Sequence, residues 1–276
     1  MPLADPHANV RCAATPGNQT ERAVPVAQVH LLLNQKGGVG KSTLTVNLAA
    51  ITADVIARPD RQVPPVLAVS IDPQGSATWW ADRVGDDLPF DFVQAHREPQ
   101  ELSRLKEIDG YEHIFVDTPG WIGPDADDDG VEDRDPLGDG RAGVALRAVL
   151  EAADDVIVPI EPEGLGFLPT ANTIENVVKP RGIPYTVVIN NWDPRDGTAD
   201  LDETKAFIDG QQFHRAQTVV RHYKIHTRAA VENRVVTQYP RNRISLEARE
   251  DFFRLALELG LGGTRRQRKG AGRAAK

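Results

Sequence analysis

The sequence of 276 residues has little cysteine and no long apolar run, and both absences narrow its function. The single cysteine, Cys12, excludes an intrachain disulfide framework and a cysteine-rich metal or iron–sulfur site within one chain. No stretch reaches the roughly 20 apolar residues that a membrane-spanning helix needs. The N-terminus also lacks the basic start and apolar core of a signal peptide. These absences favour a cytoplasmic protein that makes no membrane contact.

The net charge of −8 argues against a general affinity for nucleic acid, but the charge is unevenly distributed. Residues 121–142 hold eight acidic side chains against two arginines, whereas residues 221–243 hold six basic side chains against one glutamate. The last thirteen residues add six basic side chains and no acidic one. Such asymmetry indicates an anionic partner despite the negative sum.

Short apolar segments alternate with helical patterns along the chain. The segments that are rich in Val and Ile and apolar on both faces are typical of buried parallel strands: 29–34, 66–72, 113–119, 155–161 and 185–191. The helical patterns cover 42–57, 98–107, 143–153, 169–179, 202–212 and 244–260. This alternation predicts an α/β fold with a doubly wound, mostly parallel sheet flanked by helices. We assign residues 28–262 to this domain, 1–27 to a flexible extension and 263–276 to a flexible basic tail.

A glycine-rich stretch, "NQKGGVGKST", joins the first predicted strand to the first predicted helix. A strand, a glycine-rich turn and a helix form the context of a phosphate-binding loop, in which backbone N–H groups converge on phosphate. Lys41 is expected to contact the β- and γ-phosphates of a nucleotide, and Ser42 to give its hydroxyl to Mg²⁺. The other nucleotide-binding residues predicted in this loop are Lys36, Gly37, Gly38, Val39, Gly40 and Thr43. The loop departs from the usual pattern because Gln35 replaces the first glycine and Lys36 is a second lysine.

The segment "KGGVGKST" resembles the deviant Walker A motif of the ParA/MinD superfamily. The resemblance implies that the early lysine, Lys36, reaches across an ATP-bound sandwich dimer to the phosphates of the partner subunit. A cation that arrives only on dimerisation makes ATP the link between subunits and couples hydrolysis to their separation.

The ends of three later strands carry the other residues of the predicted site. By the same resemblance, Asp72 in "SIDPQG" orients the attacking water, and Asp117 in "IFVDTPG" lies near Mg²⁺ as a Walker B-like acid. The alternative for Asp72 is a turn that ends its strand. In "VVINNWDP" the side-chain amide of Asn190 or Asn191 is suited to read the adenine, and the resemblance matches Asn190; an asparagine there can also cap a turn. Lys36, Lys41, Asp72 and Asp117 form the predicted catalytic set, with Ser42 and Asp117 at the metal.

The acidic insert at 121–142 contains "DADDDG", which matches the first half of an EF-hand calcium loop. The position that needs a bidentate glutamate is Pro136, and no helical pattern flanks the segment. We therefore interpret the insert as a solvated loop that follows the second switch, which by the same resemblance begins at Thr118-Pro119-Gly120.

The basic region carries a DNA-binding hypothesis. Helical spacing from Arg221 through Lys224 to Arg228 predicts three cations on one face, sufficient for salt-dependent binding to the phosphate backbone without base specificity. The alternative is an ordinary solvated helix face. The remaining candidates for DNA contact are Arg241, Arg243, Arg265 and Arg266.

Over residues 28–262 the chain is thus similar to ParA-type plasmid or chromosome partition ATPases, and to small actinobacterial plasmid partition proteins among them. The resemblance implies that ATP and Mg²⁺ are the cofactors. It also implies an ATP-bound homodimer that binds DNA nonspecifically and so associates with the nucleoid. The implied partner is a ParB-like centromere-binding protein that stimulates hydrolysis. The resemblance leaves open whether dimers extend into polymers. The rival functions are a MinD-like membrane-cycling ATPase, which needs a C-terminal amphipathic helix, and a cargo-positioning ATPase or scaffold.

Overall fold

The computed structural model describes residues 26–58, 64–123 and 135–262, and this part of the chain contains one six-stranded sheet. The order across the sheet is β3-β2-β4-β1-β5-β6, and every pairing is parallel. The strands are β1 (Gln28–Leu32), β2 (Val66–Ser70), β3 (Asp91–Gln94), β4 (His113–Asp117), β5 (Asp155–Ile160) and β6 (Tyr185–Ile189). The predicted fold class and all five predicted strands are therefore confirmed.

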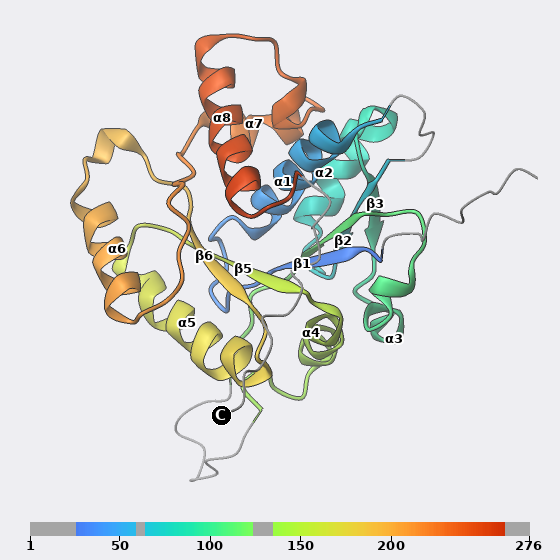
Figure 1. Ribbon diagram of the computed structural model, residues 1–276, viewed down its shortest axis with the longest axis vertical. Coiled ribbons are helices and arrows are strands. Elements are labelled where there is room, and N and C mark those ends of the chain that lie inside the picture. The colour runs from blue at the N-terminus through green and yellow to red at the C-terminus, as the bar shows by residue number, and fades with distance from the viewer. Residues whose placement is uncertain (1–25, 59–63, 124–134, 263–276) are drawn as a thin grey trace, which may run out of the picture.

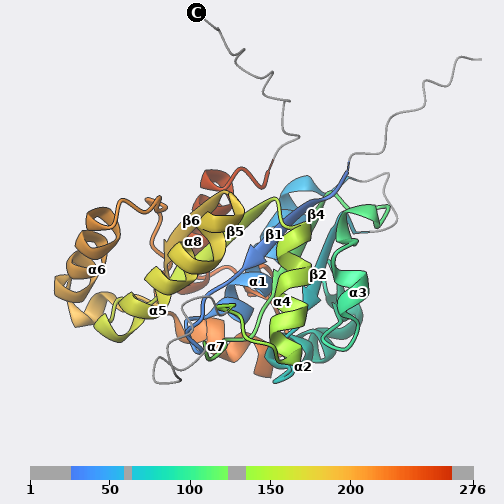
Figure 2. The same ribbon diagram turned by 90° about the horizontal axis from the view of Figure 1, so that it is seen from below.

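Alternation along each strand sends side chains into two separate cores. On β4, Ile114 and Val116 join one cluster of buried residues and Phe115 joins the other. The cluster around Phe115 is covered by α1 (Lys41–Ile56), α2 (Ser76–Val84), α7 (Lys224–Val231) and α8 (Arg243–Glu258). The opposite face is covered by α3 (Pro99–Leu102), α4 (Arg141–Ala152), α5 (Phe167–Asn172) and α6 (Ala199–Gly210). Figure 1 shows these two layers on either side of the sheet, and Figure 2 places α3 and α6 at opposite ends of the domain.

Two elements were not predicted, α2 and β3. Strand β3 has the sequence DFVQ, lies at the sheet edge and is only partly buried, so it carries no continuous apolar run. The helix predicted over 98–107 is broken into α3 and a 3₁₀ turn at Leu105–Glu107. The helix predicted over 169–179 starts as α5 and continues as a π-helix at Thr173–Val178.

The sheet register aligns the strand ends that carry the predicted site. Asp117 at the end of β4 pairs with Leu32 of β1 on one side and with Ser70 of β2 on the other. From β1 the chain first builds one half of the sheet and then crosses to β5 and β6, so the order reverses beside β1. Ligands of open α/β sheets bind at such a reversal. Among the helices described, none is both long and apolar enough to cross a bilayer.

Candidate functional site

The loop between β1 and α1 is held in a conformation that requires glycine. Gly38 and Gly40 have φ angles of 84° and 85°, in the left-handed region that favours glycine. A Cβ on Gly40 would lie 2.2 Å from Nδ2 of Asn190, and the same Nδ2 donates a 2.9 Å hydrogen bond to the carbonyl of Val39. The end of β6 therefore fixes the loop from one side and leaves no room for a side chain at position 40.

Lys41 lies at the start of α1 and is almost fully buried, with 6% of its surface exposed. Its Nζ donates hydrogen bonds of 3.0 Å to the carbonyl of Asn34 and 2.9 Å to the carbonyl of Lys36. Burial lowers the pKa of Lys41 to about 8, against the opposing effects of Asp117 and Asp72. A phosphate in the loop would stabilise the charged ammonium that the protein itself desolvates.

Asn34 and Gln35 anchor the start of the loop, and sequence reasoning missed the role of Asn34. Its Nδ2 donates to the carbonyl of Pro159 and to Oγ1 of Thr170, while its Oδ1 accepts from the Lys36 N–H. The sequence signal was an asparagine directly after an apolar strand. A polar side chain buried there needs hydrogen-bond partners, and this need indicates a structural role.

The position that lacks the usual glycine, Gln35, joins the loop to the segment after β4. The carbonyl of Gln35 accepts a 3.1 Å hydrogen bond from the Trp121 N–H. A Cβ on Gly120 would lie 2.8 Å from that carbonyl, so the two backbones approach closely. The predicted second switch therefore begins in direct contact with the phosphate loop.

Ser42 and Asp117 come together as predicted for a metal site. Ser42 Oγ donates a 2.9 Å hydrogen bond to Asp117 Oδ2, and Ser70 Oγ lies 3.3 Å from the same oxygen. Asp117 is fully buried, and its Oδ1 has no hydrogen-bond partner among the described residues. Burial is the main cause that raises the pKa of Asp117 to about 7; the Ser42 hydrogen bond opposes this shift, and the negative charge of Asp72 adds to it. Hydroxyl and carboxylate oxygens beside an unpaired buried oxygen suit Mg²⁺, which would also restore the charged carboxylate.

A cavity of about 280 Å³ lies between the loop and the ends of β2 and β4. Asp72 lines this cavity with Lys41, Ser42 and Thr43, opposite the glycines of the loop. The Gln74 N–H donates a 2.9 Å hydrogen bond to Asp72 Oδ1, and Gln94 Nε2 donates one of 2.9 Å to the Asp72 carbonyl. The strand-ending turn considered as an alternative is therefore present, and it directs Asp72 to the cavity.

Lys36 is not among the residues that line this cavity. Its Nζ forms an ion pair with Glu163, which follows β5, and the Lys36 side chain is 22% exposed. Within one protomer the partly exposed side chain of the second lysine therefore points to Glu163 after β5, and only the Lys36 backbone carbonyl contacts Lys41.

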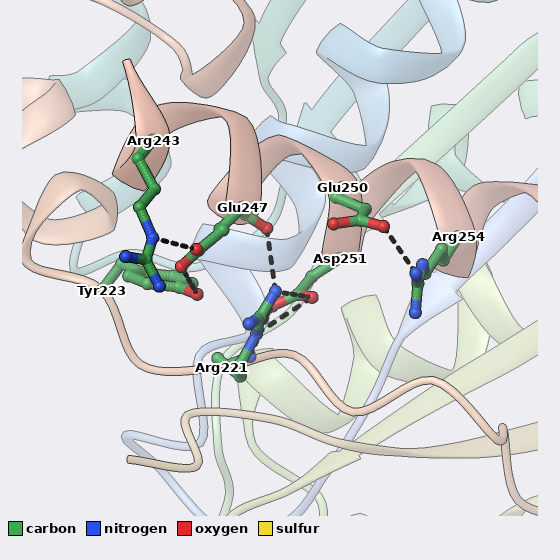
Figure 3. A network of polar contacts seen from close by, with 7 residues as sticks. All are labelled: Arg221, Tyr223, Arg243, Glu247, Glu250, Asp251 and Arg254. Carbon is green, nitrogen blue, oxygen red and sulfur yellow. Dashed lines mark hydrogen bonds and ion pairs between the residues drawn. The ribbon is translucent and has the colours of Figure 1, made fainter. Parts of the chain in front are cut away.

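The expected DNA stripe is not formed as predicted. Arg221 precedes α7, and its guanidinium donates to both carboxylate oxygens of Asp251 and to the carbonyl of Glu247 on α8 (Figure 3). Asp251 is buried, with 5% of its surface exposed. This fixed pair also raises the pKa of Arg221, the Asp251 hydrogen bond being the largest cause. Arg221 thus anchors the segment before α7 to α8, which corrects its predicted place on one helical face with Lys224 and Arg228.

The other basic side chains lie nearer the solvent. Arg228 pairs with Glu232 at 3.0 Å, and Arg243 pairs with Glu247 at 2.9 Å, where Figure 3 shows it beside Tyr223. In the part of the chain that the structure describes, Lys224 and Arg241 have no acidic partner within ion-pair distance. Exposed pairs contribute little and exchange readily, so these four cations can still meet an anionic polymer. Arg265, Arg266 and the segment "DADDDG" lie outside the described residues.

Fold and site together define a P-loop nucleotide-binding protein whose loop carries two lysines. The family model of the CobQ/CobB/MinD/ParA nucleotide-binding domain matches residues 31–231, and the chain belongs to this family. The predicted recognition and enzyme class, a ParA/MinD-type ATPase, are thereby confirmed.

Several proteins with established descriptions are similar to this chain. It is 35% identical over 232 residues to the maintenance of carboxysome distribution protein A of Gloeobacter kilaueensis, covering 84% of this chain and 94% of that protein. It is 32% identical over 183 residues to the chromosome-partitioning ATPase Soj of Thermus thermophilus, covering 59% and 69%. The solved structure of Cyanothece McdA in complex with ATP has a TM-score of 0.60 at 12% identity, covering 87% of this chain and 99% of that one. The solved structure of MinD from Pyrococcus horikoshii with Mg-ADP has a TM-score of 0.58 at 19% identity, covering 84% of this chain and 96% of that one. These likenesses agree with ATP and Mg²⁺ as the predicted cofactors.

Proposed function

We propose that this protein is an ATP-dependent switch that partitions DNA. Two protomers join face to face through bound ATP, the dimer binds nonspecific DNA, and a ParB-like partner stimulates hydrolysis and so releases it. The observation that carries this proposal is that the partly exposed Lys36 pairs with Glu163 and does not line its own phosphate cavity. A lysine placed there is available to a second subunit.

The described side chains divide the work of phosphoryl transfer among them. Lys41 holds the β- and γ-phosphates while the N–H groups of the glycine loop surround them. Ser42 and Asp117 hold Mg²⁺, which neutralises charge on the phosphate oxygens when bound. Asp72, fixed through its backbone by Gln94, holds the attacking water and accepts its proton. Asn190 closes the loop from β6 and offers its remaining amide atoms to the adenine.

DNA binding rests on Lys224, Arg228, Arg241 and Arg243, with Arg265 and Arg266 in the tail as further contacts. Arg221 takes part only by holding this region to α8. The proposed location is the cytoplasm, in association with the nucleoid. Dimers on DNA are the proposed assembly, and longer polymers are one outcome that sedimentation of the DNA complex would reveal.

The first test is binding to duplex DNA of arbitrary sequence with ATP, ADP or no nucleotide, across a series of salt concentrations. Tight binding only with ATP that weakens steeply as salt rises would support the proposal. Lys36→Ala is the matched variant, because it leaves the cavity lining intact and removes the cation offered to the second subunit. Binding that is indifferent to nucleotide, or full ATP-dependent binding by Lys36→Ala, would contradict the proposal.

A second candidate function is the positioning of a protein cargo on DNA. It is favoured by the likeness to the carboxysome distribution protein, which spans 94% of that relative. The two functions differ in what is lost on deletion of the gene. A partition protein is expected to lose its DNA molecule from dividing cells, whereas a cargo-positioning protein would leave DNA inheritance unchanged and displace a protein assembly. No observation on the described residues favours the MinD-like alternative.

A further inference from the structure

A second cavity, of about 660 Å³, lies directly behind the segment that carries Asp72. Its walls come from Ile71 and Pro73, from His96 and Arg97 after β3, and from the first turn of α4. None of its lining residues lines the nucleotide cavity. The volume is that of an ordinary small-molecule site.

The segment after β2 is a wall shared by the two cavities. Ile71 and Pro73, the direct neighbours of Asp72, line the second cavity, whereas Asp72 and Gln74 line the nucleotide cavity. A ligand that contacts Pro73 or Ile71 and displaces either residue would therefore move the backbone that positions the Asp72 carboxylate.

A side-chain link joins the two cavities as well. Gln94 Nε2 lies 2.8 Å from His96 Nδ1 and donates a 2.9 Å hydrogen bond to the carbonyl of Asp72. The hydroxyl of Thr78 on α2 is hydrogen-bonded to Oε1 of the same glutamine. Displacement of His96 by a ligand would thus change the contacts that Gln94 makes with Asp72 and with α2.

The lining specifies the chemistry of the ligand. Ile71 and Ala145 form an apolar floor, with 2% and 3% of their surfaces exposed. Two exposed guanidinium groups, Arg97 and Arg141, stand at the cavity against one carboxylate, that of Asp139. Within the described ranges neither arginine forms an ion pair with an acid. Arg97 Nε lies 3.2 Å from His96 Nε2, so the terminal nitrogens of Arg97 and the guanidinium of Arg141 are available to an anion.

We propose that this cavity is an effector site that takes a ligand with an apolar body and one anionic group, and that occupancy repositions Asp72. Binding at the cavity is independent of the proposed partition function, whereas its effect on hydrolysis rests on the proposed role of Asp72. The site provides a place where a regulator can alter the ATPase rate without competing with nucleotide.

The test uses anilinonaphthalene sulfonate, a fluorescent probe with an aromatic body and one sulfonate, in the presence of excess Mg-ADP to fill the nucleotide cavity. We expect saturable binding that the double variant Arg97→Glu/Arg141→Glu weakens about tenfold. Val144→Asp, which adds a carboxylate at an exposed lining position, should weaken it similarly. Arg104→Glu/Arg254→Glu is the matched control, because it makes the same total charge change on two exposed arginines outside the cavity.

Absence of saturable binding, or equal binding by the wild type and the cavity variants, would overturn the site. In parallel, the probe should change the kcat of wild-type ATP hydrolysis and leave the kcat of Arg97→Glu/Arg141→Glu unaltered. A probe that binds as expected without changing kcat would overturn the link to Asp72. If the protein shows no ATP-dependent DNA binding, the partition proposal fails. The fluorescence titration still decides whether the cavity binds the probe.

Discussion

The hydroxyl of Ser42, the second residue of α1, donates a 2.9 Å hydrogen bond to Oδ2 of Asp117, the last residue of β4. The second oxygen of this buried carboxylate has no partner among the described residues, although an unpaired buried oxygen is costly. The pair therefore has the arrangement that a divalent cation and its waters complete.

Asp117→Asn is expected to lower kcat for ATP hydrolysis and to raise the Mg²⁺ concentration needed for half-maximal rate, each by about 10- to 100-fold. The amide removes the negative charge and keeps the shape of the side chain. Ser70→Ala is the control, since its hydroxyl lies 3.3 Å from the same carboxylate and should matter less. The rate measured across a Mg²⁺ titration checks this, and an unchanged Mg²⁺ requirement in Asp117→Asn would place the metal elsewhere.

Glu163→Gln is expected to increase ATP-dependent dimerisation, because the protein no longer has to break the Lys36–Glu163 pair before Lys36 meets a second subunit. Both side chains are partly exposed, so the gain should be at most about fivefold in the dimerisation constant. Lys36→Ala should abolish dimerisation under the same conditions. Sedimentation with a slowly hydrolysed ATP analogue gives the measurement, and weaker dimerisation of Glu163→Gln would indicate that Glu163 itself serves the interface.

Arg221→Ala is expected to destabilise the fold by about 3 kcal/mol, because it leaves the buried Asp251 carboxylate without its cation. Arg228→Ala removes an exposed pair and should cost well under 1 kcal/mol, on the order of a few tenths. Urea unfolding of both variants provides the comparison. The double variant Arg221→Ala/Asp251→Ala should recover part of the lost stability. Equal stability of Arg221→Ala and the wild type would contradict the anchoring role of Arg221 and leave it as a candidate for DNA contact.

The strands and the phosphate loop were predictable because each is specified locally. Runs such as 29–34 are apolar on both faces, which only a strand covered by helices on both sides satisfies. Glycines and a lysine at fixed spacing between a strand and a helix leave few alternatives to a phosphate site. The approach of Ser42 to Asp117 followed from the same logic, since parallel strands end at one edge.

The features that sequence reasoning missed depend on distant contacts. The stripe of Arg221, Lys224 and Arg228 assumed a helix that in fact begins only at Lys224, and the partner of Arg221 lies 30 residues away on α8. The use of Asn190 to hold the Val39 carbonyl joins residues 151 positions apart, which spacing along the chain does not reveal. The edge strand β3 was not predicted because it is only partly buried, and a partly buried strand does not need a continuous apolar run.

Buried histidines make the stability of the fold sensitive to acid. His226 on α7 packs edge-on against Tyr223 and Phe252, and its Nε2 has no hydrogen-bond partner among the described residues. Burial lowers the pKa of His226 to about 4, and burial likewise lowers the pKa of His113 to about 4. Each neutral imidazole therefore contributes stability that is complete above the unfolded-state pKa of about 6.5 and is lost as the pH falls toward 4.

His226→Phe is expected to flatten this acid dependence, because a ring of similar shape remains between Tyr223 and Phe252 and takes up no proton. One such histidine accounts for a slope of up to about 1.4 kcal/mol per pH unit in the free energy of unfolding below about pH 6.5. Urea unfolding at several pH values between about 7 and 5 measures that slope, with His113 still contributing in the variant. Parallel slopes for His226→Phe and the wild type would show that His226 accepts a proton in the folded state at little cost.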